Sequence, residues 1–161
     1  MTRSTDLLTR HGRTIITCPG CGGKRLAVAI ALTLLATNYV GAAAGAGDAY
    51  AVQLGKLIND YRTQNRVPTL ALDAPLSEIA DEHATRMARE NRLSHDGFQE
   101  RFAKARSPTC VENVGWNQRT PEAEFEAWRN SPTHARNLLD STITKMGIAI
   151  EARYVAFFAC R

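Results

Sequence analysis

Two long stretches of the chain carry apolar residues at helical spacing. The first stripe comprises Tyr50, Leu54, Leu57, Ile58 and Tyr61, and the second comprises Leu76, Ile79, Ala80, His83, Ala84 and Met87. Intervals of three and four residues place each set on one face of a helix. Asp73-Ala74-Pro75 supplies a start for the second helix, and Val67-Pro68 fits a turn between the two. We expect His83 to be a core residue with one hydrogen-bond partner rather than a metal ligand.

Three shorter helices are predicted further along the chain. The segment Phe98–Ala105 is predicted to form the first of these helices. Thr120 and Ser131 are good N-caps, and each is followed by a proline, which suits the first helical position. The helix that Thr120 opens has an apolar stripe of Ala123, Ala127 and Trp128, with Phe125 flanking it. His134 falls at the third position of the helix that Ser131 opens, where unpaired backbone N–H groups and the helix dipole disfavour a protonated imidazole.

Three further segments predict β-strands. Thr109–Trp116 is short and β-rich, and Met146–Ile150 and Tyr154–Cys160 are apolar. The tight connection Glu151-Ala152-Arg153 is typical of a hairpin that closes the chain. Because helices precede and interleave with a few strands, the sequence predicts one α+β domain.

The N-terminal part has the pattern of a secretory signal peptide. Lys24 and Arg25 precede the apolar run Leu26–Ala36, and small residues follow it. The run is short for a membrane span, so we expect cleavage between Ala42 and Ala51 and export to the periplasm or the exterior. The alternative is an uncleaved anchor, which would be the chain's contact with a membrane. We therefore divide the chain into a leader, residues 1–48, and a domain, residues 49–161.

Most of the net positive charge of the chain belongs to the leader. The whole chain has a net charge of +4 and a pI of about 9.1. Residues 1–48 hold five of the twenty basic and two of the sixteen acidic residues, so the rest has a net charge of +1. Nucleic-acid binding needs a basic surface, and we therefore expect no nucleic-acid partner.

The four cysteines fall into two pairs. Cys18 and Cys21, in TCPGCGG, are weak evidence for zinc or redox chemistry and have no role if the leader is removed. Cys110 and Cys160 belong to the domain. In an oxidising compartment an even count suggests a disulfide, and the alternative is two buried thiols. Export favours the disulfide, which would stabilise the fold by roughly 4 kcal/mol on the chain-entropy account.

Five blocks of sequence carry a resemblance to a known family. The candidates for a metal site are His95, Glu112 and His134, which are too far apart in the sequence to form a local metal motif. Each of them lies in a distinctive block, and these blocks are LSHDGFQER, VENVGW and EAWRNSPTHARNLLD. MGIAI follows them, and LINDYRTQNRVPTLALDAPLSEIADEHATRMA precedes them as two helices. In this order, from about Leu54 to Cys160, the blocks resemble the CAP superfamily (cysteine-rich secretory proteins, antigen 5 and pathogenesis-related 1 proteins; the SCP domain), especially its compact bacterial members.

The resemblance implies a three-layer α-β-α sandwich with a small, mostly antiparallel sheet and a central cavity. It assigns the cavity histidines to His95 and His134, which could hold zinc or another divalent metal, and the cavity glutamate to Glu112. Ser131 stands where eukaryotic members have a second cavity glutamate. Val111 and Thr133 replace glycines of the family pattern.

Three functions follow from these expectations. The first is a binding module for a small apolar ligand or lipid. The second is a zinc-dependent hydrolase in which His95, His134 and Glu112 activate water, although two protein ligands are fewer than catalytic zinc sites usually have. The third is a protein that acts on partners through its surface loops. The sequence favours the first and leaves open whether any catalysis occurs, and it does not indicate an oligomeric state.

Overall fold

The structure, a computed structural model, describes residues 45–161. The predicted leader lies outside the described residues except for its last four, and so does the pair Cys18 and Cys21. Within residues 45–161, no helix has both the length and the hydropathy to span a membrane.

The two predicted stripes form the two longest helices. Helix α1 spans Ala46–Gln64 and α2 spans Ala74–Glu90. Asp73 caps α2, and its side chain accepts a hydrogen bond from the backbone N–H of Leu76 at 3.1 Å. A two-residue strand, β1 at Ala71–Leu72, precedes this cap. A strand of two residues has no alternating pattern, which is why the sequence did not predict it.

Four strands form one sheet in the order β1-β3-β4-β2. Strand β2 spans Cys110–Trp116, β3 spans Lys145–Glu151 and β4 spans Tyr154–Cys160. The predicted hairpin is confirmed, because β3 and β4 pair in antiparallel register around a turn. Strand β2 pairs antiparallel with β4, and only the short β1 runs parallel to its neighbour β3.

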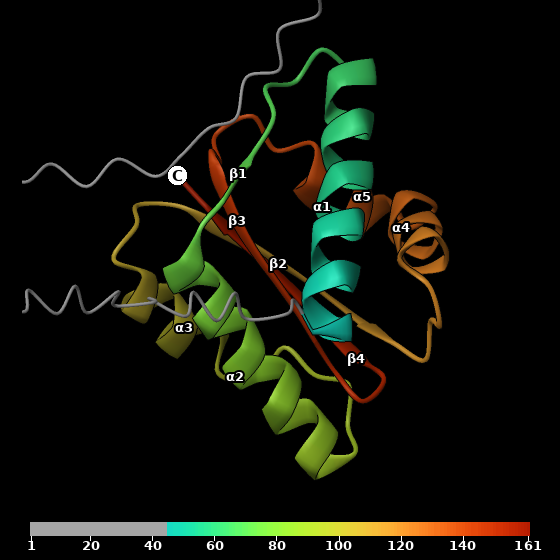
Figure 1. The fold of residues 1–161 in the computed structure, drawn as a ribbon. Helices are drawn as coiled ribbons and strands as arrows, with labels where there is room; N and C mark the ends of the chain where they lie inside the picture. The colour runs from blue at the N-terminus through green and yellow to red at the C-terminus, as the bar shows by residue number, and fades with distance from the viewer. Residues whose placement is uncertain (1–44) are drawn as a thin grey trace, which may run out of the picture. The chain divides into compact units, whose positions relative to one another are not determined.

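Helices cover both faces of the sheet (Figure 1), which confirms the predicted α-β-α sandwich. Helices α2 and α3, Phe98–Ala105, lie on one face. Helices α1, α4, Pro121–Arg129, and α5, Pro132–Leu138, lie on the other. The sheet separates two hydrophobic clusters, one around Leu54, Trp128 and Phe157 on the α1 side and one around Met87 and Phe158 on the α2 side.

Two features tie the sheet to its surroundings. The predicted disulfide is present: Cys110 and Cys160 lie opposite each other on β2 and β4, with an S–S distance of 2.05 Å. Helix α2 lies directly against the sheet at Gly147, where a Cβ atom would approach the backbone carbon of Leu76 to 2.1 Å. A side chain at residue 147 would therefore push the helix off the sheet.

The inward face of α4 differs from the predicted stripe. Phe125 and Trp128 are buried, but Ala127 is exposed and Glu124 is buried in its place. The cause is Gly115 on β2, because a Cβ atom there would lie 2.0 Å from Glu124 Oε1. The missing side chain of Gly115 provides the space that the carboxyl group fills.

Candidate functional site

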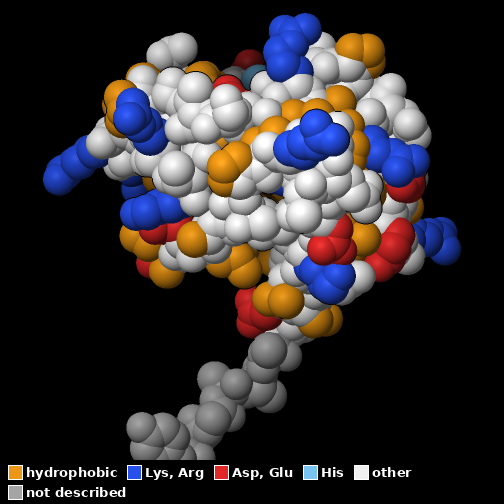
Figure 2. All heavy atoms as spheres, turned by 90° about the horizontal axis from the view of Figure 1, so that it is seen from above, with side chains coloured by type: hydrophobic (Ala, Val, Ile, Leu, Met, Phe, Trp, Pro, Cys, Tyr) orange, Lys and Arg blue, Asp and Glu red, His pale blue; other side chains and the backbone are white. Residues whose placement is uncertain are grey.

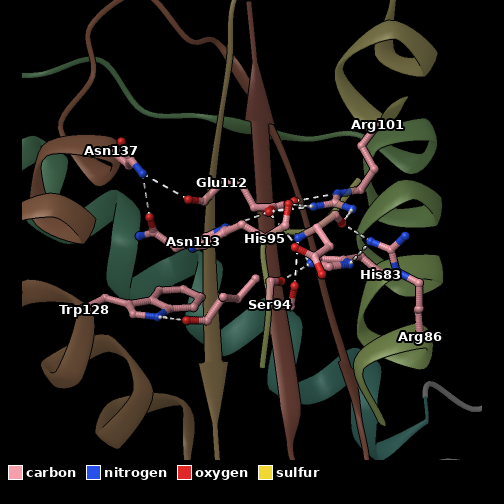
Figure 3. A network of polar contacts seen from close by, with 11 residues as sticks. His83, Arg86, Ser94, His95, Arg101, Glu112, Asn113, Trp128 and Asn137 are labelled. Atoms are coloured by element: carbon pink, nitrogen blue, oxygen red, sulfur yellow. Dashed lines mark hydrogen bonds and ion pairs between the residues drawn. The ribbon is translucent and has the colours of Figure 1, made fainter. Parts of the chain in front are cut away.

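Glu112 lies on the buried part of β2 and holds His95 at the surface of the molecule (Figure 3). Its Oε1 atom is 2.9 Å from His95 Nδ1. His95 comes from the loop between α2 and α3, and its side chain is about half exposed. In the neutral imidazole, Nδ1–H donates to Glu112 and Nε2 keeps its lone pair free. The carboxylate therefore sets which ring nitrogen of His95 is available.

Arg101 binds the same carboxylate from α3. Its Nε donates to Glu112 Oε2 at 2.6 Å and its Nη2 donates to Oε1 at 2.7 Å, a two-point ion pair. Burial by itself would raise the pKa of Glu112, but hydrogen bonds from His95 and Arg101 and the arginine charge outweigh burial and lower it. Glu112 is therefore an ionised carboxylate at neutral pH.

The loop that carries His95 is held through its backbone carbonyls. His83 Nε2 donates to Ser94 O at 2.8 Å, and Arg101 Nη1 donates to Asp96 O at 2.8 Å. Arg86 donates to Asp96 O as well and to His83 Nδ1, which fixes the tautomer of His83. These bonds hold the residues on both sides of His95, so α2 and α3 position its backbone while Glu112 on β2 orients its ring.

His83 is a buried core residue, as predicted, but it has two hydrogen-bond partners rather than one. Burial lowers its pKa to about 4, although Glu112 acts in the opposite direction. The ring is thus neutral at physiological pH. Its Nε2–H is already donated to a carbonyl, so His83 is not available as a metal ligand.

His134 lies in the first turn of α5, at the third helical position, as predicted. Its pKa is lowered, mainly by burial and then by the charge of His95. The predicted direction is therefore correct, but burial is the main cause. Asn113 Nδ2 donates to His134 O at 3.2 Å, and Asn137 Nδ2 donates to Glu112 O at 3.0 Å. These two amides connect α5 to β2 beside Glu112.

His95, Glu112 and His134 line one cavity of about 400 Å³, which we call the histidine cavity. The other lining residues are Phe98, Cys110, Val111, Thr133 and Asn137. Val111 and Thr133, the two replacements of family glycines, both lie in this wall. Ser131 occupies the N-cap position of α5 and is not among the lining residues.

The donor groups of the histidine cavity fit a metal ion only in part. Two imidazoles face it, but the Glu112 carboxylate is bound by Arg101. Within residues 45–161 there is no group of three or more His, Cys, Asp or Glu side chains able to hold a metal ion together. Any metal at this place would have two protein ligands and open positions.

Sequence reasoning missed two residues of the site, Arg101 and Asn137. Arg101 lies three residues after Phe98, so both share the inward face of α3, and it is 7% exposed. A charged residue on the apolar stripe of a short helix was the available signal. For Asn137 the sequence offers no comparable signal, because its partners come from β2.

Together, the two-layered core and the polar cavity at the edge of the sheet define a small α-β-α sandwich protein of the SCP type. A profile of the cysteine-rich secretory protein family, CAP, matches residues 56–158. The chain belongs to this family.

Several known proteins are similar to the chain. It is 29% identical over 119 residues to the uncharacterized protein YkwD of Bacillus subtilis, covering 70% of this chain and 46% of that protein. An extracellular protein containing an SCP domain from Bacillus anthracis has a similar structure, with a TM-score of 0.68, 24% identity and coverage of 71% of this chain and 41% of that one. A cysteine-rich secretory protein from Staphylococcus aureus is also similar in structure, with a TM-score of 0.66 and 19% identity. The match covers 73% of this chain and 40% of that one. The chain spans less than half the length of these relatives.

Proposed function

We propose that the chain is an exported binding module whose histidine cavity takes up a small ligand. The observation that carries this proposal is the pair of imidazoles, His95 and His134, that come from separate elements and line one cavity. Export is supported by the predicted signal peptide and by the extracellular and secretory relatives.

The lining of the cavity indicates the kind of ligand. Phe98 and Val111 offer apolar contact, whereas Thr133 and Asn137 offer polar groups beside the two histidines. Such a mixed wall suits a small apolar molecule, or the end of a lipid, that carries a polar group.

We propose further that a divalent metal, with zinc as the first candidate, binds between His95 and His134. Neutral imidazoles are ready ligands, and the Glu112 contact leaves Nε2 of His95 free. When bound, the ion would supply open coordination positions for the polar group of the ligand. Glu112 and Arg101 would act as positioning residues for His95.

The geometry favours binding over hydrolysis. A hydrolase would use Glu112 as the base that activates water. Both oxygens of this carboxylate accept hydrogen bonds from Arg101, and its lowered pKa makes it a weak base. No specific observation supports the zinc-dependent hydrolase.

Zinc titration of the purified full chain by calorimetry tests the proposal. We expect one ion per chain, with binding lost in His95→Ala and in His134→Ala. Thr133→Ala is the matched control, because it trims the same wall without removing an imidazole. We expect Glu112→Gln to weaken binding by about tenfold or more, since it removes the carboxylate that orients His95. Equal zinc binding by the wild type and both histidine variants would refute the metal proposal.

A ligand screen tests the binding module separately. The melting temperature of the chain is measured with medium-chain fatty acids as probes, with and without zinc. A saturable rise that His134→Ala abolishes supports the proposal. If the chain instead turns over ester substrates at a rate that His95→Ala removes, the hydrolase is the better description.

A further inference from the structure

A second and larger hollow lies at the opposite edge of the sheet. It has a volume of about 640 Å³ and runs between the first turns of α1 and α2, alongside the second half of β3. We call it the edge groove. Two of the four large hydrophobic side chains exposed within residues 45–161, Val52 and Leu72, line it. It shares no lining residue with the histidine cavity.

The floor of the edge groove is an open strand edge. Strand β1 covers β3 only at Lys145 and Met146, and the backbone N–H of Asp73 then donates to Met146 O at 2.9 Å. Backbone groups of alternate residues point to the same side of a strand, so those of Ile148 and Ile150 face the groove. Within residues 45–161, no hydrogen bond reaches them from that side.

The opposite edge of the same sheet, along β2, is covered by side chains. Strand β2 has an outer edge too, but Asn137 donates to Glu112 O at 3.0 Å and Trp128 Nε1 donates to Val114 O at 3.3 Å. Side chains of α4 and α5 thus cover that edge. Proteins usually protect exposed strand edges, so the bare stretch of β3 stands out as a place for pairing.

The two walls of the edge groove differ in character. Even-numbered residues of β3 face α1, since a Cβ on Gly55 would contact the side chains of Met146 and Ile148. On this side Ala51 and Val52 complete an apolar wall. The wall formed by α2 is polar and acidic.

The acidic groups of the groove are largely unpaired. Glu78 and Asp81 lie on the α2 wall, and Asp48 lies at the start of α1. Among residues 45–161, none of the three has an ion-pair partner, whereas Asp73 pairs with Lys145. Figure 2 shows acidic side chains next to hydrophobic ones on the face that it presents.

We propose that the edge groove binds an extended peptide segment in which apolar and basic residues alternate. The segment adds to the sheet as a short strand and pairs with the backbone of Ile148 and Ile150. Because side chains of a strand point alternately to its two faces, every second residue contacts the apolar α1 wall. The residues between them face Glu78 and Asp81, where a lysine or arginine fits.

The length of the segment follows from the ends of the groove. Leu72 marks one end, and Gly47 marks the other, where a Cβ would lie 3.8 Å from Ile150 O. The open stretch from Gly147 to Ile150 corresponds to roughly 10 Å of extended chain, so about four residues of the partner are held.

The test uses the purified full chain and the probe peptide Val-Lys-Val-Lys-Val-amide with fluorescein on its N-terminus, followed by fluorescence anisotropy. We expect saturable binding. The matched peptide with glutamate for lysine should not bind, and N-methylation of the valines, which blocks strand pairing, should abolish binding. We expect the double variant Glu78→Gln, Asp81→Asn to weaken binding about fivefold, the effect of losing two partly exposed charge pairs.

Control variants separate the edge groove from general charge effects. Glu82→Gln with Glu100→Gln removes two carboxylates outside the groove and should leave affinity unchanged. Val52→Lys should weaken binding without unfolding the chain, because Val52 is 58% exposed. Equal binding of both peptides, equal binding by the Glu78 and Asp81 variant, or no binding would overturn the proposal. So would a dimer of the chain that Val52→Lys dissociates, because it would assign the edge to a second copy.

Discussion

Replacing Glu124 by glutamine should change how stability depends on pH. Glu124 is 1% exposed, and its Oε2 atom has no hydrogen-bond partner within residues 45–161. Burial raises its pKa to about 7. A glutamine has nearly the same shape but carries no proton to lose, so Glu124→Gln removes the titration and keeps the packing against Gly115.

The size of the effect follows from the difference between the folded and unfolded pKa. The unfolded value is 4.5, and the folded value is about 7. Below about pH 4.5 both states hold the proton, so Glu124 has no influence. Between these values the unfolded state loses its proton first, so the folded state is progressively destabilised. Above pH 7 the loss is constant at about 3 kcal/mol, since one pKa unit corresponds to about 1.4 kcal/mol.

Other buried groups oppose this trend, so the wild-type curve alone is not sufficient. His83 has a folded pKa of about 4, below its ordinary value of 6.5, and therefore adds stability as pH rises through this window. Glu112, whose pKa is also lowered, acts in the same direction at lower pH. These contributions cancel when the variant is subtracted from the wild type.

Urea denaturation followed by tryptophan fluorescence measures the difference. We expect Glu124→Gln to gain about 3 kcal/mol relative to the wild type between pH 4.5 and pH 8. Glu126→Gln is the control, because Glu126 is on the same helix but pairs with Arg129 at the surface. A difference curve that is flat over this range would show that Glu124 titrates normally and would refute the reasoning.

Three further predictions concern stability. Arg101→Met should destabilise by about 3 kcal/mol or more, because it leaves the Glu112 carboxylate buried without its partner; adding Glu112→Gln should recover part of the loss in urea denaturation. Reduction of Cys110–Cys160, or Cys110→Ser with Cys160→Ser, should cost about 4 kcal/mol, seen as a lower melting temperature with dithiothreitol. Gly147→Ala should cost more than 3 kcal/mol, since its methyl group would meet the backbone of α2, and an unchanged melting temperature would contradict this packing.

The regular elements were predictable because local signals agree with the fold. Thr120 caps α4 and accepts a hydrogen bond from Ala123 N at 3.2 Å, as its sequence position before Pro121 indicates. The same logic placed α2 behind Asp73. The hairpin of β3 and β4 was visible from two apolar runs separated by a short polar connection.

The buried charges were not predictable in this way. Arg62 is fully buried near the end of α1, where it donates to Pro68 O at 2.7 Å and to Leu138 O at 2.6 Å. Its carbonyl partners come from a loop and from the end of α5. Glu124 likewise depends on a glycine of a different element. Such residues appear as ordinary surface charges in the sequence, because what compensates or encloses them is brought close only by the tertiary fold.

The candidate site could be predicted from the sequence only in part. His95, Glu112 and His134 could be grouped only through the family resemblance, since 39 residues of sequence separate the two histidines. The structure brings all three to one cavity, where Glu112 accepts a hydrogen bond from His95. Both oxygens of its carboxylate also accept hydrogen bonds from Arg101, a partner that the sequence did not indicate.

The two edges of the sheet connect these findings. At the β2 edge, side chains satisfy the strand backbone, and the resulting polar layer carries the histidine cavity. At the β3 edge, the backbone of Ile148 and Ile150 has no such cover among the described residues, and the walls above it are apolar on one side and acidic on the other. Because the two proposed sites share no lining residue, binding at one should not depend on the other. Peptide binding at β3 should therefore persist in His95→Ala, and zinc binding should persist in the Glu78→Gln, Asp81→Asn variant.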